Sequence, residues 1–140
     1  KQENIIKYVI RAKKNPLKKE EAAKYYPQMA PSTPVTLAQI IKRVEKRSTV
    51  SSSDVKAVLD ALQYEVIEAL QNGNSVRLGD LGSFRLTMKA EGSPSSETAR
   101  RKGADGIKSV NVQFTKSTAM RDALSPANIE FSMQEDITND

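Results

Sequence analysis

Residues 76–86 read VRLGDLGSFRL, a pattern typical of two short strands joined by a tight turn. Apolar residues alternate with polar ones on both sides of residues 79–82, as they do in strands that bury one face. The glycines in the connection supply the positive φ angles that tight turns need. The stretch therefore predicts a β-hairpin, with Gly82 in the turn and Phe84 on the inward face.

Two helices are predicted before this hairpin. Thr36 and Gln39 have the spacing of a capping box, which satisfies backbone N–H groups at the start of a helix. Apolar residues then recur at helical spacing from residue 37 to about residue 47. A second apolar stripe runs from the cap-forming SSSD sequence at 51–54 to Leu70. Residues 72–74, Asn-Gly-Asn, tolerate the left-handed conformation that ends a helix.

A two-stranded arm is predicted after the hairpin. Val110, Val112 and Phe114 resume strand alternation, and we expect Phe114 to be a core residue like Phe84. Residues 90–106 between these strands are rich in Ser, Gly and Arg and hold almost no large apolar side chain. We therefore expect an arm over about residues 87–113 with a polar, mobile tip. A last short helix is predicted over residues 118–124, before Pro126.

The chain ends are predicted to lie outside the compact domain. Residues 1–35 form an N-terminal extension with an expected strand over 5–11, a turn, a short helix over 18–26 and a connection containing three prolines. Residues 36–124 form the expected compact domain, and residues 125–140 an acidic tail. The sequence holds no internal repeat.

The composition limits the classes of function. The chain has 140 residues, 38% hydrophobic and 5% aromatic, which is little apolar material for the core of one chain, so burial is expected to need a partner. It has no Cys and no His, which removes thiolate metal sites and the commonest general base, and it has no phosphate-binding loop. We expect no enzyme activity, no catalytic residues, no metal, no cofactor and no small-molecule substrate.

Charge is polarised along the chain, whose formal net charge is +5. Residues 1–19 hold seven bases and one acid, residues 85–121 hold eight bases and three acids, and residues 122–140 hold five acids and no base. This distribution favours a basic working surface and a polyanionic partner. No apolar run approaches the roughly 20 residues of a membrane span, so we expect a cytoplasmic protein without a membrane partner.

The order of these elements resembles the HU/integration-host-factor family of bacterial histone-like DNA-binding proteins, especially its longer HU-like variants with an N-terminal extension. The resemblance covers about residues 36–124. Its strongest stretches are LQNG at 70–73 with VRL at 76–78, GSFR at 82–85, and Phe114 followed by AMRDAL at 119–124. Their order and spacing carry the resemblance more than any single motif does.

This resemblance implies an α+β, HU/IHF-type fold: a helical pair and a β-sheet with a projecting two-stranded arm, in an intertwined dimer, expected to be a homodimer. It also implies sequence-tolerant, architectural binding of duplex DNA in the nucleoid, with the basic arms in the minor groove. Eight basic residues are expected to bind DNA. They are Arg85, Lys89, Arg100, Arg101, Lys102, Lys108, Lys116 and Arg121.

The sequence departs from the family pattern in two places. The family's Arg-Asn-Pro arm tip is absent, and Pro94, flanked by serines, is the candidate for the wedge that separates two base pairs. Lys116-Ser117-Thr118 stands where the family usually has a glycine and then a lysine before the last helix.

Two other functions stay open at the level of sequence. RNA also attracts exposed basic arms, although the arm has no aromatic residue between Phe84 and Phe114 on which bases would stack. The fold is also compatible with a structural or protein-interaction role, which the altered tip and the acidic tail favour.

Overall fold

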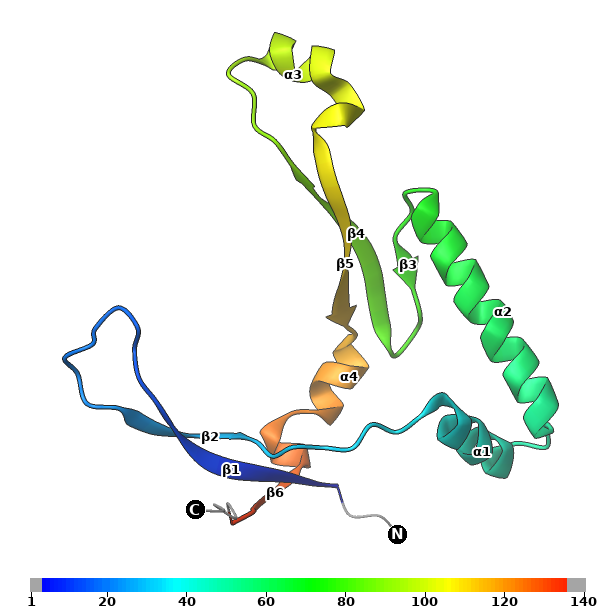
Figure 1. Cartoon of the computed structure of the whole chain (residues 1–140). Coiled ribbons are helices and arrows are strands. Elements are labelled where there is room, and N and C mark those ends of the chain that lie inside the picture. The colour runs from blue at the N-terminus through cyan, green and yellow to red at the C-terminus, as the bar shows by residue number, and fades with distance from the viewer. Residues whose placement is uncertain (1–3, 136–140) are drawn as a thin grey trace. The chain divides into compact units, whose positions relative to one another are not determined.

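The computed structural model describes residues 4–135 and divides the chain into two compact units (Figure 1). The arm unit is Thr36–Arg121. The sheet unit combines the chain before Thr36 with the chain after Arg121.

The arm unit begins with two helices, α1 (Leu37–Arg47) and α2 (Ser52–Gln71), as predicted. The capping box of α1 is present: the Gln39 N–H donates to the Thr36 hydroxyl at 3.3 Å, and the Thr36 N–H donates to the Gln39 side-chain oxygen at 2.9 Å. Ser51 caps α2 by accepting from the Asp54 N–H at 3.3 Å. Gly73 follows α2 with a φ of 81°, which confirms the expected left-handed residue at its end.

Three antiparallel strands complete the framework of the arm unit, in the order β3-β4-β5. They are β3 (Val76–Arg77), β4 (Gly82–Ala90) and β5 (Ile107–Lys116), and the helix α4 (Thr118–Ala123) follows them. The predicted hairpin and the positive φ of Gly82 are confirmed, but Gly82, at φ +146°, is the first residue of β4 and not part of the turn. A Cβ atom on Gly82 would lie 2.2 Å from the Thr115 carbonyl oxygen. This close approach of β4 to β5 therefore requires glycine.

The arm tip differs from the prediction of a mobile loop. It contains the helix α3 (Ser96–Lys102) and the 3-10 turn η1 (Gly103–Gly106). The local sequence explains the helix, because Ser95 is an N-cap, Glu97 is in the first turn and three bases are in the last turn. The tip lacks an apolar stripe, so the periodicity of hydrophobic residues gave no sign of this helix.

The sheet unit contains three strands in the order β2-β1-β6. They are β1 (Ile5–Lys13), β2 (Lys24–Met29) and β6 (Glu130–Met133), with the 3-10 turn η2 (Pro126–Asn128) before β6. Strand β2 pairs antiparallel to β1, and β6 pairs parallel to it.

Two expectations for the chain ends are corrected by this sheet. The short helix expected over residues 18–26 is wrong, because residues 24–29 form β2 and Pro27 lies opposite Ile10 in an edge strand, where a proline is tolerated. Within the segment expected to be an acidic tail, Glu130–Met133 form β6. Residues 136–140 of that tail lie outside the described part of the chain.

Large apolar surfaces of the arm unit are exposed in the single chain. The rings of Phe84 and Phe114 are in contact, with centroids 5.2 Å apart and planes tilted by 56°. Phe114 is nevertheless 47% exposed, so the core position expected for it is only partly filled within one chain. Val58, Leu62 and Ile67 of α2 are exposed as well. No helix among residues 4–135 is long and apolar enough to cross a membrane.

Candidate nucleic-acid interface

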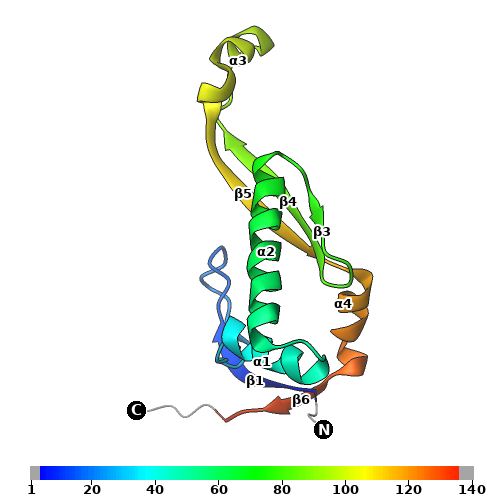
Figure 2. The same ribbon diagram turned by 90° about the vertical axis from the view of Figure 1, so that its right-hand side faces the viewer.

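The strands β4 and β5 form an arm with one apolar and one polar face. Figures 1 and 2 both show these strands extending beyond the end of α2, with α3 at their far end. The register places Phe84, Leu86 and Met88 opposite Phe114, Val112 and Val110 respectively. Because strand residues alternate between faces, these six apolar side chains share one face, and the intervening polar residues share the other.

Arg85 and Lys89 stand on the polar face of the arm. Arg85 lies opposite Gln113 and donates to its side-chain oxygen at 2.5 Å. Lys89 lies opposite Ser109 near the outer end of the strands. Both bases are exposed, and their neighbours on this face are uncharged polar residues. The polar face therefore presents positive charge on a narrow two-stranded ribbon.

Lys108 and Lys116 occupy irregular and terminal positions of β5. The register shifts near Lys89 and Ala90, so Lys108 has no opposite residue in β4 and lies at a β-bulge. Bulges change the direction in which a side chain points. Lys116 lies opposite Gly82 at the inner end of the arm. The two lysines therefore mark the outer and inner limits of the basic ribbon.

The three bases of the tip lie on the last turn of α3. Arg101 forms an ion pair with Glu97 at 3.2 Å, and Lys102 forms one with Glu91. The sequence alone does not distinguish these three bases. Among residues 4–135, Arg100 has no ion-pair partner, so the cluster holds one unpaired and two paired cations.

Pro94 lies in the connection between β4 and α3, directly before the N-cap Ser95. It is exposed. The structure thus places the candidate wedge at the start of a helix and not in a two-residue turn between strands.

Arg121 lies on α4, outside the arm. Ser117, one of the residues that depart from the family pattern, starts this helix: its hydroxyl accepts from the Met120 N–H at 3.0 Å, and its N–H donates to the Leu81 carbonyl at 3.2 Å. Ser117 therefore ties α4 to the hairpin turn, a role that its N-cap chemistry would have indicated.

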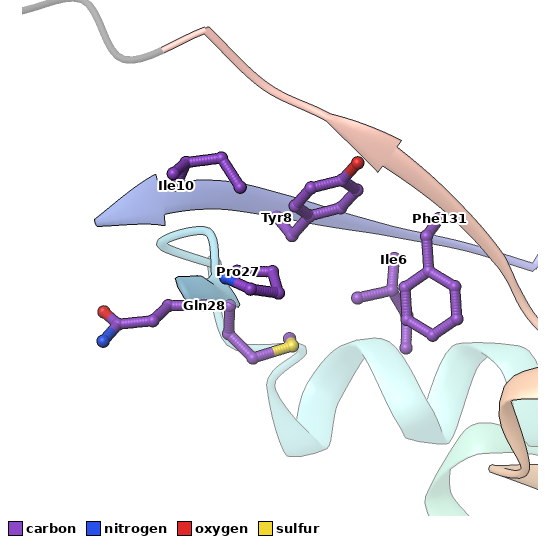
Figure 3. Close-up of a pocket in the computed structure, with 7 residues that line it drawn as sticks. Ile6, Tyr8, Ile10, Pro27, Gln28 and Phe131 are labelled. Carbon is purple, nitrogen blue, oxygen red and sulfur yellow. The ribbon is translucent and has the colours of Figure 1, made fainter. Parts of the chain in front are cut away.

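The sheet unit carries a second candidate surface. Side chains from all three strands line a depression of about 550 Å³ (Figure 3). Phe131 of β6 is paired with Ile6, and Pro27 of β2 is paired with Ile10. The lining residues carry no charge; they are Ile6, Tyr8, Ile10, Pro27, Gln28, Met29 and Phe131. No group of three potential metal ligands occurs among the described residues.

Together, the helical pair, the three-stranded sheet and the projecting arm define an α+β protein of the histone-like HU type. The chain belongs to the HU-HIG family, whose model, described as an HU domain fused to wHTH, Ig, or glycine-rich motif, matches residues 5–131.

Two curated relatives named DNA-binding protein HU are similar to this chain. The protein from Thermus thermophilus is 35% identical over 80 residues, covering 57% of this chain and 70% of the relative. The protein from Caulobacter vibrioides is 27% identical over 86 residues, covering 53% of this chain and 94% of the relative.

Solved structures support the same fold. A crystal structure of a Bacteroides vulgatus protein matches with a TM-score of 0.67 at 17% identity and covers 95% of this chain. The chain spans half the length of that protein. An Anabaena HU–DNA cocrystal structure matches with a TM-score of 0.50 at 21% identity, covering 66% of this chain and 99% of that one. The HU-type fold is therefore shown for the part of the chain that contains the arm.

Proposed function

We propose that this protein binds duplex DNA in a sequence-tolerant, architectural manner as a component of the bacterial nucleoid. The observation that carries the proposal is the basic polar face of the β4–β5 arm in a chain of the HU-HIG family. The names of two relatives and the DNA in the Anabaena cocrystal support it. The proposed activity is binding without chemical catalysis.

Phosphate contacts supply the affinity in this proposal. Arg85 and Lys89 on the polar face, together with Lys108 and Lys116, follow the ribbon from its inner to its outer end. Arginine side chains are attracted to the strong negative potential of a narrow minor groove, so we place the ribbon along that groove. Phosphate and sugar contacts carry little sequence information, which makes the binding tolerant of sequence. Arg121 on α4 adds a contact at the base of the arm.

The binding species is proposed to be a homodimer. The apolar face of the arm unit, with Phe114, Val112 and Val110 about half exposed, is too extensive to remain in water. Exposed apolar residues of α2, including Ile67, add to this surface. A second copy of the chain offers the same surfaces for mutual burial, as isologous dimers do.

The test is a set of binding isotherms at two or more salt concentrations, with a mixed-sequence 30-base-pair duplex, a single-stranded RNA of equal length and no nucleic acid. We expect preference for the duplex and a negative slope of log K against log salt concentration. Equal binding of the single-stranded RNA would favour an RNA-binding function. Absence of nucleic-acid binding would refute the proposal.

A second candidate function, protein interaction, rests on the apolar face of the sheet unit. Met29 and Phe131 are more than half exposed on a surface that holds no charge. Such a surface is suited to contact with another apolar protein surface, including a second copy of the chain. Replacement of Phe131 by Ser should then lower the association state in sedimentation at unchanged DNA affinity. An unchanged association state would remove this candidate.

A further inference from the structure

The tip lobe, residues 91–106, is a folded element at the end of the arm. The Thr98 N–H donates to the Ser95 hydroxyl at 3.1 Å, which satisfies an N–H group in the first turn of α3. At the other end, Gly103 with a φ of +55° terminates the helix. Glu97 in the first turn and three bases in the last turn match the helix dipole. Local chemistry alone therefore favours a helix at the tip.

Glu91 connects the two sides of the tip lobe. Its backbone N–H donates to the Gly106 carbonyl at 2.8 Å, and its carboxylate forms an ion pair with Lys102. The Lys102 stem passes over Gly106, where an added Cβ would meet the Lys102 Cδ at 3.8 Å. Gly106 is buried by these contacts. The lobe is thus closed at its base and presents α3 as a formed helix before any partner binds.

The width of a helix limits where the tip lobe can enter DNA. An α-helix with its side chains is roughly 10–12 Å across, whereas the minor groove of B-DNA is about 6 Å wide. The major groove, about 12 Å wide, admits a helix. A two-stranded ribbon with its side chains also exceeds about 6 Å, so the strands of the arm require a minor groove widened by DNA bending, whereas the helix of the tip lobe enters the major groove without such widening.

The ion pairs of the tip lobe indicate which of its three bases contacts DNA. Arg101 and Lys102 are paired with Glu97 and Glu91, whereas Arg100 has no ion-pair partner among residues 4–135. An unpaired guanidinium gains most from a phosphate or a guanine edge, because it does not have to leave a carboxylate first. Arg100 is thus the side chain of the lobe best prepared to bind DNA.

We propose that the tip lobe docks in the major groove beside the minor-groove site of the ribbon, with Arg100 as its principal contact. The proposal rests on the duplex-binding function above. In this arrangement Pro94, which precedes a formed helix, is not inserted between base pairs. Glu91 is a positioning residue, because it holds α3 on the arm without touching DNA.

The experiment is dimethyl sulfate footprinting, which methylates guanine N7 in the major groove and adenine N3 in the minor groove. The probe is a mixed-sequence 30-base-pair duplex saturated with full-length protein. One variant replaces residues 92–105 by Asn-Gly, which forms a two-residue hairpin turn and leaves the rest of the chain unchanged. We expect wild type to protect both atoms and the shortened variant to protect adenine N3 alone.

Single substitutions locate the contact. Arg100→Ala should abolish protection of guanine N7 and lower the magnitude of the salt slope by about 1.8, one contact on each of two arms. The matched control, Lys89→Ala, also removes one exposed arm cation but should retain protection of guanine N7. If Arg100→Ala unfolds α3, amide hydrogen exchange over residues 96–102 will reveal it. Arg100→Lys then serves as the folded variant, with weakened but retained protection of guanine N7.

A second comparison tests the positioning role of Glu91. Glu91→Gln and Glu97→Gln each remove one carboxylate from the tip lobe, so their effect on net charge is equal. Only Glu91→Gln breaks the connection between β4 and α3. Glu91→Gln should therefore speed amide exchange of α3 and weaken protection of guanine N7 relative to Glu97→Gln. Equal exchange and equal protection in the two variants would show that Glu91 does not position α3.

The outcomes separate the two proposals. Protection of adenine N3 without any protection of guanine N7 overturns the docking of the lobe and leaves duplex binding intact. Guanine N7 protection that persists in the shortened variant also overturns it. Loss of all protection in wild type, together with flat isotherms, refutes duplex binding and the docking of the lobe with it.

Discussion

The substitution Gly82→Ala tests the packing of the hairpin against the arm. Gly82 is buried and has a φ of +146°, a conformation that residues with a Cβ rarely adopt. The new methyl carbon would lie 2.2 Å from the Thr115 carbonyl oxygen and 2.8 Å from the Phe114 Cζ. Neither neighbour is the free end of a flexible chain, since one is backbone and the other belongs to a packed ring.

The cost has two parts. An unfavourable backbone conformation costs roughly 1–3 kcal/mol, and overpacking against fixed neighbours costs roughly 1–3 kcal/mol more. We therefore expect Gly82→Ala to destabilise the arm unit by about 2–6 kcal/mol. For a unit of this size, about 1 kcal/mol corresponds to about 4–8 °C in Tm. The expected fall in Tm is at least about 8 °C.

Thermal unfolding followed by circular dichroism at fixed protein concentration measures this cost, and two other glycines separate its parts. Gly79 has a φ of +53° and open space around it, so Gly79→Ala carries the conformational cost alone, about 1–2 kcal/mol. Gly92 has open space and no positive φ, so Gly92→Ala should change stability by less than about 0.5 kcal/mol. If Gly82→Ala melts within 2 °C of Gly92→Ala, our account of this turn is wrong.

Three other predictions concern burial and charge. Phe114→Ala should lower the stability of the dimer by roughly 3–5 kcal/mol if the second copy covers the exposed part of the ring, and an unchanged Tm would contradict that assignment. The triple variant Arg100→Ala, Arg101→Ala, Lys102→Ala should change the free energy of unfolding by less than about 0.5 kcal/mol. It should lower the magnitude of the slope of log K against log salt concentration by at most about 5, and by less if the two ion-paired bases contribute little. Removal of residues 135–140 deletes three acids but no part of β6, so it should tighten DNA binding; equal affinity of the two forms would show that the tail does not oppose phosphate.

The helices and the arm strands were predictable because their signals are local. The capping box at Thr36 and the apolar spacing of α1 and α2 depend on residues within a few turns of each other. The alternation around Phe84 and Phe114 likewise identifies strands without knowledge of their partners. The positive φ predicted for Gly82 is confirmed, but Gly82 is the first residue of β4 and not part of the turn.

Strand β1 confirms the strand predicted over residues 5–11, but the rest of the sheet unit was not predictable, because its pairing is not local. The aromatic pair Tyr25 and Tyr26 favours a strand, but Pro27 argues against one until the edge position of β2 is known. Strand β6 has four residues, too few for a pattern, and it exists because β1 lies beside it. The edge position of β2 and the pairing of β6 with β1 depend on residues far apart in the chain, so a short stretch of sequence does not reveal them.

The candidate site was predicted in its residue types but not in its organisation. All eight expected bases are exposed, and seven of them lie on β4, α3 or β5. The sequence does not show which of these bases are ion-paired. The ion pair of Glu91 with Lys102, for example, depends on where the strands end and how the tip folds back. The signal for α3 is present at Ser95 and Glu97, in capping chemistry and not in apolar periodicity.

The parallel pairing of β1 with β6 joins two segments that are synthesised at different times. Strand β1 is translated before the arm unit, whereas its neighbour β6 is translated after the arm unit. Of the two strands that flank β1, only β2 is available at that stage, and the other edge of β1 stays without β6 until β6 has left the ribosome. An open apolar edge recruits strands from other chains, and closure of so long a loop is slow. The nascent chain is therefore most exposed to aggregation in the interval between the synthesis of β2 and that of β6.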